Sequence, residues 1–161
     1  VKAFASLSRD PEIANLNLQL VLVGKTGLGW QEINEEIEKN KLRDKVIITG
    51  WLNDRIVAGL MREASVFVFP SFYEGFGLPI IEAMASGVPV VTSSAASCPE
   101  VADQAALVVD PHDPVKIAEA IKKILLDNNL KENLIKTGLI RAKTFDWQKC
   151  AHSTLKIITS Q

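Results

Sequence analysis

Residues 70–91 read Pro70-Ser-Phe-Tyr-Glu-Gly-Phe-Gly-Leu-Pro-Ile-Ile-Glu-Ala-Met-Ala-Ser-Gly-Val-Pro-Val-Val91 and directly follow an apolar, strand-like run over 66–69. The glycines of this stretch can take backbone angles that other residues avoid, and they let a ligand approach the main chain closely. Pro79 suits the first turn of a helix, because the first amides of a helix are unpaired in any case. The stretch therefore predicts a strand, a glycine turn and a helix start in succession.

Two glutamates frame this turn. Glu74 lies in the turn and Glu82, eight positions later, lies about one turn inside the expected helix. The unpaired amides and the dipole of a helix start favour an anion such as a phosphate, and carboxylates accept hydrogen bonds from the paired hydroxyls of sugars and ribose. The pattern predicts a site for a polyhydroxylated, phosphate-bearing ligand.

Apolar strands alternate with amphipathic helices along the whole chain, which is the pattern of an α/β domain with a parallel sheet covered on both faces. We expect strands over 18–24, 46–50, 66–69, 88–92 and 106–109. We expect helices over 1–9, 30–40, 54–64, 79–86, 114–127, 130–144 and 147–158, with a loop around Pro99 and Glu100. Asp113, Asn129 and Asp146 are the expected caps of the last three helices.

Ligands of open α/β sheets bind outside the carboxyl ends of the strands. The loops after Gly24, Gly50, Phe69 and Thr92 all follow expected strand ends. We therefore expect these four loops to converge on one site.

Length and composition fit one folded domain. The chain has 161 residues, 47% of them hydrophobic and 23% charged, and a formal net charge of -1. This balance argues against disorder and gives no electrostatic reason to expect nucleic acid as a partner. No apolar run is long enough to span a bilayer, and no signal peptide opens the sequence. Cys98 and Cys150 lack metal-ligand spacing, fit a reducing cytoplasm and are expected to be packing residues.

The segment from Glu74 to Val91 resembles the donor-site signature of the group 1 (family 4) retaining glycosyltransferases of the GT-B architecture, in which two glutamates flank seven residues. The likeness covers nearly the whole chain. Its other segments are Val21–Gly24, Ile48–Asp54, Ala64–Ser71, Ser97–Val101, Ala105–Pro111 and Phe145–Trp147. The resemblance implies a Rossmann-like three-layer domain with a parallel sheet, one half of a GT-B enzyme.

The resemblance also implies roles for individual residues. Glu74 would contact hydroxyls of the transferred sugar and count as the catalytic residue, and Glu82 would contact the ribose of the nucleotide. The donor-binding set is Glu74, Gly75, Phe76, Gly77, Leu78, Glu82, Gly50, Leu52 and Asp54. The substrate would be a nucleotide-diphosphate sugar, with no other cofactor and no metal at the site.

The same resemblance implies how the chain relates to a whole enzyme. Residues 1–161 would form a single donor-binding domain that lacks its first strand, the cations that neutralise the donor diphosphate, and the N-terminal acceptor-binding domain. The full-length enzyme would act in polysaccharide synthesis in the cytoplasm, reaching the inner membrane surface only through that absent half. The fragment alone would be inactive. The segment 147–158 packs toward the absent half in relatives, so we expect Ile157 and Ile158 to be exposed.

Several alternatives remain open at the level of sequence. A nucleotide-sugar epimerase, a sugar phosphorylase or a non-catalytic nucleotide-sugar-binding module could use the same scaffold. A glycoside hydrolase is less favoured, because its two carboxyls face each other across the bond that is cut, whereas here a phosphate-seating turn separates them.

Other motifs give weaker evidence of function. Gly24-Lys25-Thr26 lacks the earlier glycine of a nucleoside-triphosphate loop, since Gln19 stands there, so Lys25 is read as a loop residue. His112 and His152 have no partner cluster that would suggest a metal or a general base. The helix over 114–127 carries a stripe that we expect to face the core, made of Val115, Ile117, Ala118, Ile121, Ile124 and Leu125.

Overall fold

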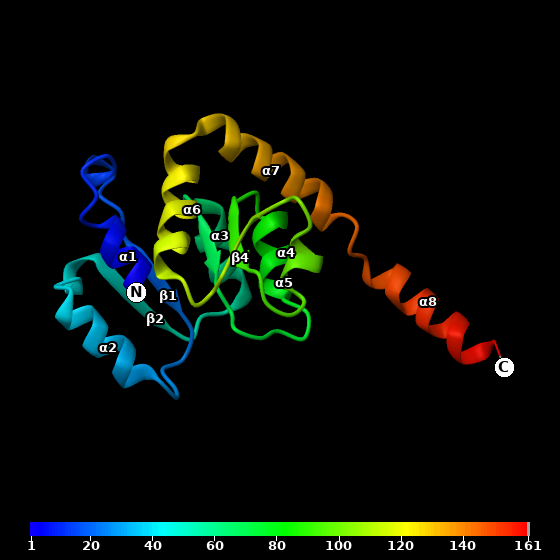
Figure 1. Cartoon of the computed structure of the whole chain (residues 1–161). Helices are drawn as coiled ribbons and strands as arrows, with labels where there is room; N and C mark the ends of the chain where they lie inside the picture. The colour runs from blue at the N-terminus through cyan, green and yellow to red at the C-terminus, as the bar shows by residue number, and fades with distance from the viewer. Residues whose placement is uncertain (161) are drawn as a thin grey trace.

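The computed structural model describes residues 1–160 and has the alternating α/β order that the sequence predicts (Figure 1). The strands are β1 (Leu20–Val23), β2 (Val46–Gly50), β3 (Phe67–Phe69), β4 (Val90–Ser93) and β5 (Leu107–Val109). The helices are α1 (Lys2–Leu7), α2 (Trp30–Lys39), α3 (Asp54–Glu63), α4 (Leu78–Ala85), α5 (Cys98–Ala102), α6 (Pro114–Leu126), α7 (Asn128–Ala142) and α8 (Trp147–Thr159). Short 3₁₀ turns cover Ala14–Leu16 and Arg43–Lys45.

All strand pairs are parallel, as expected, but the strands form two sheets instead of one. β1 pairs with β2, while β3, β4 and β5 pair in that order. Within residues 1–160, no ladder joins β1 to β3, so each of these strands has an unpaired edge. The two sheets are held together through helices and not through strand hydrogen bonds.

The three-stranded sheet is covered on both faces because its side chains alternate. Val68, Val91 and Val109 pack with α6, whose Ile124 is fully buried. The opposite face, with Phe67, Phe69 and Val90, packs against α3, α4 and α5. α7 then lies against α4, where Gly138 allows contact: a Cβ built at Gly138 would come within 3.2 Å of Met84 Cγ.

The two-stranded sheet is covered on one face only. Phe4 and Ala5 of α1 and Ile37 of α2 pack on that face with residues of both strands. On the other face, Val21 and Ile47 remain exposed to solvent. The expectation of a sheet covered on both faces is therefore wrong for this half of the chain, because no helix within residues 1–160 buries that side.

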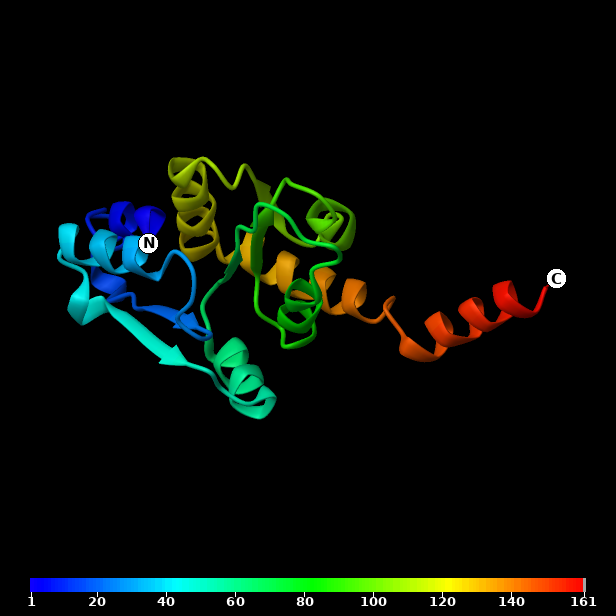
Figure 2. The same cartoon turned by 90° about the horizontal axis from the view of Figure 1, so that it is seen from below.

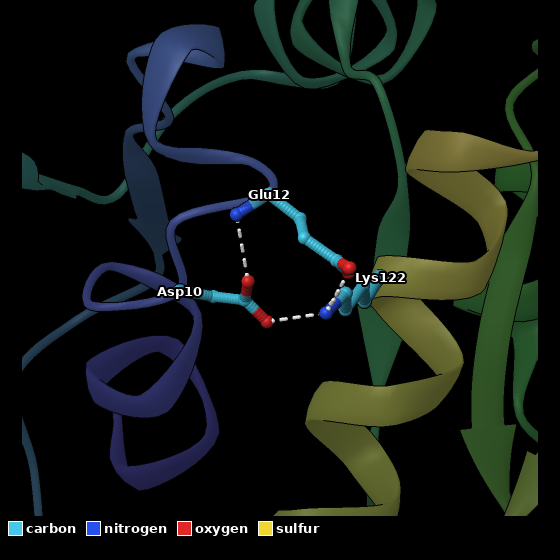
Figure 3. Close-up of polar contacts among 3 residues, drawn as sticks. All are labelled: Asp10, Glu12 and Lys122. Carbon is cyan, nitrogen blue, oxygen red and sulfur yellow. Dashed lines mark hydrogen bonds and ion pairs between the residues drawn. The ribbon is translucent and has the colours of Figure 1, made fainter.

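An ion-pair cluster ties the loop after α1 to α6. Figure 3 shows the Lys122 ammonium group between the carboxylates of Asp10 and Glu12, at 2.6 Å from Asp10 Oδ2. The backbone N–H of Glu12 donates to Asp10 Oδ1. The hydrogen bond from Lys122 lowers the pKa of Asp10, and the same bond raises the pKa of Lys122. This cluster lies beside the apolar contact between α1 and α6 that joins the two sheets.

The last helix extends away from the rest of the molecule in both views (Figures 1 and 2). No residue of α8 over 147–159 is buried, and Trp147, Ile157 and Ile158 expose 79%, 76% and 67% of their surface. The expected exposure of Ile157 and Ile158 is confirmed. Cys150 also lies on this helix and is exposed, so its prediction as a packing residue is wrong, whereas Cys98 is buried as expected.

Three details of the helices differ from expectation. The loop around Pro99 forms the short helix α5, because Pro99 sits in a first turn where its missing N–H costs nothing. α7 is capped by Asp127, whose carboxylate accepts from the Leu130 N–H, and not by Asn129. Val115 is 60% exposed, because it lies in the first turn of α6 ahead of the buried stripe.

Caps at Asp113 and Asp146 are confirmed by their hydrogen bonds to the amides that open α6 and α8. Within residues 1–160, no helix is both long enough and apolar enough to cross a bilayer.

Candidate functional site

The predicted glycine turn connects the end of β3 to the start of α4. β3 ends at Phe69, and α4 begins at Leu78 with Gly77 as its N-cap residue. Gly77 has φ +96°, a conformation that favours glycine. Among residues 1–160, no side chain caps this helix start. The glycine turn thus leads into a helix start without a side-chain cap. Pro79 is the second residue of this helix, whereas the sequence predicted it as the first.

Glu74 lies in the middle of the turn and is half-buried. The Ser71 hydroxyl lies 2.9 Å from Glu74 Oε1 and donates to it, which fixes the orientation of the carboxylate. Within the described chain, no other hydrogen bond or ion pair engages this carboxylate. Its second oxygen is therefore left to accept hydrogen bonds from a ligand.

Glu82 is the fifth residue of α4 and is exposed. Its neighbours in sequence, Ala83 and Met84, are buried in the core that α4 shares with β4 and α5. The helix is therefore firmly placed while the Glu82 carboxylate remains in solvent. Among residues 1–160, no side chain forms an ion pair or hydrogen bond with that carboxylate.

The turn also contacts two residues that the sequence did not single out as site residues. The Ser97 hydroxyl lies 2.9 Å from the carbonyl oxygens of both Glu74 and Phe76. The Phe76 ring packs edge-on against Phe145, with 5.8 Å between the ring centroids. Ser97 could have been found from the sequence, because it lies in the loop after Thr92 that was expected at the site. Nothing in the local sequence points to Phe145 as a partner of Phe76.

The loops after β1 and β2 form a second group. The Gly24 N–H donates to the Gly50 carbonyl at 3.0 Å, and Gly50 has φ +67°. Asn53 then caps α3 by accepting from the Ile56 N–H, which places Asp54 at the first position of that helix. Leu52 is half-buried and Asp54 is exposed. These contacts join the loops after Gly24 and Gly50, as expected.

The structure thus brings the predicted loops together in two pairs. Ser71, Glu74 and Ser97 join the loops after β3 and β4, and Gly24 and Gly50 join the loops after β1 and β2. Within residues 1–160, no hydrogen bond or ion pair links one pair to the other. The convergence of all four loops on a single site therefore stays a prediction.

The other residues and the cavity considered as candidate sites lie outside the predicted donor-binding set. Lys25 is exposed, and the His112 ring stacks on Phe72 with 4.5 Å between the centroids. Among the described residues, no group of three or more His, Cys, Asp or Glu side chains could hold a metal ion. An open cavity of about 250 Å³ lies between the end of α5 and α7, lined in part by Asp103, Ile140 and Arg141. None of the donor-binding residues predicted from the sequence lines it.

Comparison with known proteins identifies relatives of this chain. The family model described as glycosyl transferases group 1 matches residues 1–141. O-antigen chain mannosyltransferase B of Escherichia coli is 38% identical over 145 residues, which cover 90% of this chain and 38% of that protein.

Solved structures give the same picture of the fold. Sucrose-phosphate synthase from Thermosynechococcus elongatus superposes with a TM-score of 0.81 at 30% identity, over 99% of this chain and 42% of that one. HepE of Anabaena, in complex with UDP and glucose, superposes with a TM-score of 0.84 at 23% identity, over 99% of this chain and 43% of that one. The chain therefore spans about two fifths of the length of these relatives.

Proposed function

Because this chain belongs to the group 1 glycosyl transferase family, we propose that it is the part of a longer retaining glycosyltransferase that binds the nucleotide-sugar donor. The observation that carries the proposal is the turn from Ser71 to Leu78. Together with α4, this turn presents an oriented carboxylate, an uncapped helix start and a second, exposed carboxylate within the nine residues from Glu74 to Glu82. These are the groups that a sugar, a diphosphate and a ribose would each need.

In this proposal each group binds a different part of the donor. Glu74 accepts hydrogen bonds from hydroxyls of the sugar, and its carboxylate keeps its orientation through Ser71. The amides of Phe76, Gly77 and Leu78 face the diphosphate, and Glu82 accepts from the ribose hydroxyls. The segment from Gly50 through Leu52 to Asp54 borders the base.

Transfer then depends on position and charge more than on covalent chemistry by the protein. The bond between the anomeric carbon and the diphosphate breaks, and a bond from the acceptor hydroxyl oxygen to that carbon forms with retention of configuration. The acceptor proton leaves with the diphosphate. The amides at the start of α4 stabilise the charge that develops on the departing diphosphate.

The unpaired edges of β1 and β3 support a second part of the proposal. The doubly wound fold places its first strand between the second and the fourth. With β1 as the second strand and β3 as the fourth, one further parallel strand between them would unite the two sheets. We infer that this strand, the diphosphate-binding cations and the acceptor-binding domain are supplied by parts of the enzyme outside residues 1–161.

The mannosyltransferase relative suggests which donors to test first. O-antigen chain mannosyltransferase B is named for mannosyl transfer and for the O-antigen chain. We therefore place a nucleotide-activated mannose, used in polysaccharide synthesis, at the head of the candidate donors. A calorimetric panel of UDP, GDP, ADP and their sugars with the longer protein would identify both the base and the sugar.

Two variants of the longer protein test the division of roles. Glu74→Ala should abolish sugar transfer while leaving the affinity for the free nucleoside diphosphate largely intact. Glu82→Ala should weaken nucleoside-diphosphate binding about 10-fold or more, because it removes hydrogen bonds to a charged acceptor. Glu132→Ala, at an exposed position on α7, is the matched control and should change neither property.

Equal loss of nucleotide affinity in the Glu74 and Glu82 variants would contradict this assignment. Tight nucleotide-sugar binding without any transfer to an acceptor would favour a binding module, and isomerisation of the donor alone would favour an epimerase.

A further inference from the structure

The turn that carries Glu74 lacks a hydrogen-bonded backbone of its own. Among residues 1–160, no bond between two backbone groups begins or ends within residues 71–76, and the first such bond beyond them runs from the Ile80 N–H to the Gly77 carbonyl. Its shape must therefore be fixed by side chains. The Ser71 hydroxyl, which also lies 3.2 Å from the Tyr73 carbonyl, bonds only within the turn itself.

Ser97 is the hydrogen-bonding side chain that anchors this turn to another part of the fold. Its hydroxyl oxygen lies 2.9 Å from the carbonyl oxygen of Glu74 and 2.9 Å from that of Phe76, so its one proton is shared between them. Ser97 precedes the first residue of α5, and its side chain makes no capping bond to that helix. Its hydroxyl is thus committed to the turn and not to the stability of α5.

Because peptide bonds are planar, the contact of Ser97 with two carbonyls also fixes the direction of the two N–H groups that follow them. In a trans peptide the C=O and N–H groups point in opposite directions. If the carbonyls of Glu74 and Phe76 point toward Ser97, then the N–H groups of Gly75 and Gly77 point away from it. Among the described residues, no protein group accepts from either N–H. Two amides that are two residues apart and directed to the same side can form a concave site for an anion.

The segment just after the end of α7 also contacts this turn. The Phe145 ring packs edge-on against Phe76, and the Arg141 guanidinium lies 4.8 Å from the Phe145 ring centroid. Arg141 also donates to the carbonyls of Glu100 and Val101, at 2.7 and 3.0 Å. Arg141, in the last turn of α7, therefore holds α5, the helix that starts next to Ser97, and Phe145, just beyond the end of α7, packs against the Phe76 ring.

We propose that Ser97 is a positioning residue for the donor, whose hydroxyl aims the Gly75 and Gly77 amides at the phosphate groups. The identity of the ligand in this inference rests on the proposed function. The orientation of the two amides by Ser97 does not depend on it. Ser97 acts through the backbone of the turn and does not itself touch the sugar or the diphosphate.

Kinetics of the longer protein test the role with three variants. Ser97→Ala should reduce kcat/KM for the nucleotide sugar about 10-fold, through a rise in the donor KM together with a fall in kcat, with the acceptor KM unchanged. Ser97→Thr keeps a hydroxyl and should recover most of the loss. Ser94→Ala, an exposed serine of the same loop, is the matched control and should behave like the wild type.

An NMR readout on the 161-residue chain separates this inference from the proposed function. The amide shifts of Gly75 and Gly77 should move in Ser97→Ala and stay in place in Ser94→Ala, whether or not any sugar nucleotide binds. Addition of inorganic pyrophosphate should shift the same two amides in the wild type.

Unchanged glycine shifts in Ser97→Ala would overturn the inference, as would a kinetic loss that Ser97→Thr fails to recover. A wild type that transfers no sugar, with glycine amides that still respond to Ser97→Ala and to pyrophosphate, would refute the proposed function and leave the positioning role intact.

Discussion

Replacement of Gly77 by alanine should strain the turn at the start of α4. Gly77 has φ +96°, and a Cβ built on it would lie 3.1 Å from Ile80 Cδ1. A left-handed conformation costs a residue with a Cβ about 1–2 kcal/mol. The contact adds to this cost, because Ile80 is fully buried and has little room to move. We expect Gly77→Ala to lower the free energy of unfolding by about 1–3 kcal/mol.

Gly75 provides the matched control two residues away. A Cβ at Gly75 would meet no atom within 4 Å, and its φ lies outside the left-handed range. Gly75→Ala should therefore change stability by no more than about 0.5 kcal/mol. Urea unfolding of both variants, followed by circular dichroism, gives the comparison. In a domain of this size each kcal/mol should also lower Tm by about 2–4 °C.

A double variant separates the two sources of strain at Gly77. Ile80→Val removes Cδ1, the atom that an alanine Cβ would approach, and costs about 0.5–1.5 kcal/mol by itself. If the dihedral angle dominates, the costs of Gly77→Ala and Ile80→Val should add. If the contact dominates, the double variant should lose less than the sum. Equal stability of Gly77→Ala and Gly75→Ala would refute the reasoning altogether.

Three further predictions concern the core, the ion pairs and the last helix. Ile124→Ala should lower the free energy of unfolding by about 2–5 kcal/mol in urea unfolding, whereas Val115→Ala, on the exposed first turn of α6, should change it by less than about 0.5 kcal/mol. Because Lys122 lowers the pKa of Asp10, their contact stabilises the fold above the ordinary aspartate pKa of about 4 and is lost below it. Lys122→Met should therefore lose less stability than the wild type between about pH 5 and pH 3, measured by urea unfolding at each pH. Removal of residues 147–161 should leave the urea midpoint of the remaining chain nearly unchanged, because no residue of α8 is buried.

The sequence predicted much of this fold because its strands and helices carry strong local patterns. β2 lies over the predicted residues, and most other strands and helices differ from the prediction by one or two residues at an end. Such agreement is expected where periodicity and capping act together, as at Asp113 and Asp146. The family resemblance read from Glu74 to Val91 is confirmed by the match over residues 1–141.

What the sequence could not predict depends on contacts between distant segments. The split between β1 and β3 follows from which strands are neighbours in space, and the pattern within each strand carries no such information. α5 was read as a loop because a helix of five residues is too short to show a periodicity. The exposure of Cys150 depends on α8 leaving the body of the molecule, which no local pattern of that helix reveals.

The site residues also divide into those found from one stretch of sequence and those that depend on contacts between distant segments. Glu74, Glu82 and the glycines between them could be found because they lie close together in one stretch of sequence. Ser97 and Phe145 contact that stretch from 21 or more residues away, as seen in the bond from Ser97 to the Phe76 carbonyl. The loop that carries Ser97 was expected at the site, but the bonds that Ser97 makes and the contact of Phe145 depend on the tertiary structure.

The two carboxylates of the proposed donor site are held in place in different ways. This difference affects how a donor would be recognised. α4 holds Glu82 on a helix whose Ile80, Ala83 and Met84 are at most 1% exposed, so the position of this carboxylate is set by the core. Within the described part of the chain, the turn around Glu74 makes no backbone hydrogen bonds of its own, and it depends on the Ser71 and Ser97 hydroxyls and the Phe76 ring. The ribose would then bind to a fixed helix, whereas the sugar would bind to a turn that single side chains can reshape. Ser71→Ala, which frees the Glu74 carboxylate, should accordingly alter the choice of sugar before it alters the affinity for the nucleotide, whereas Ser97→Ala acts on the amides that face the phosphates and should also raise the donor KM.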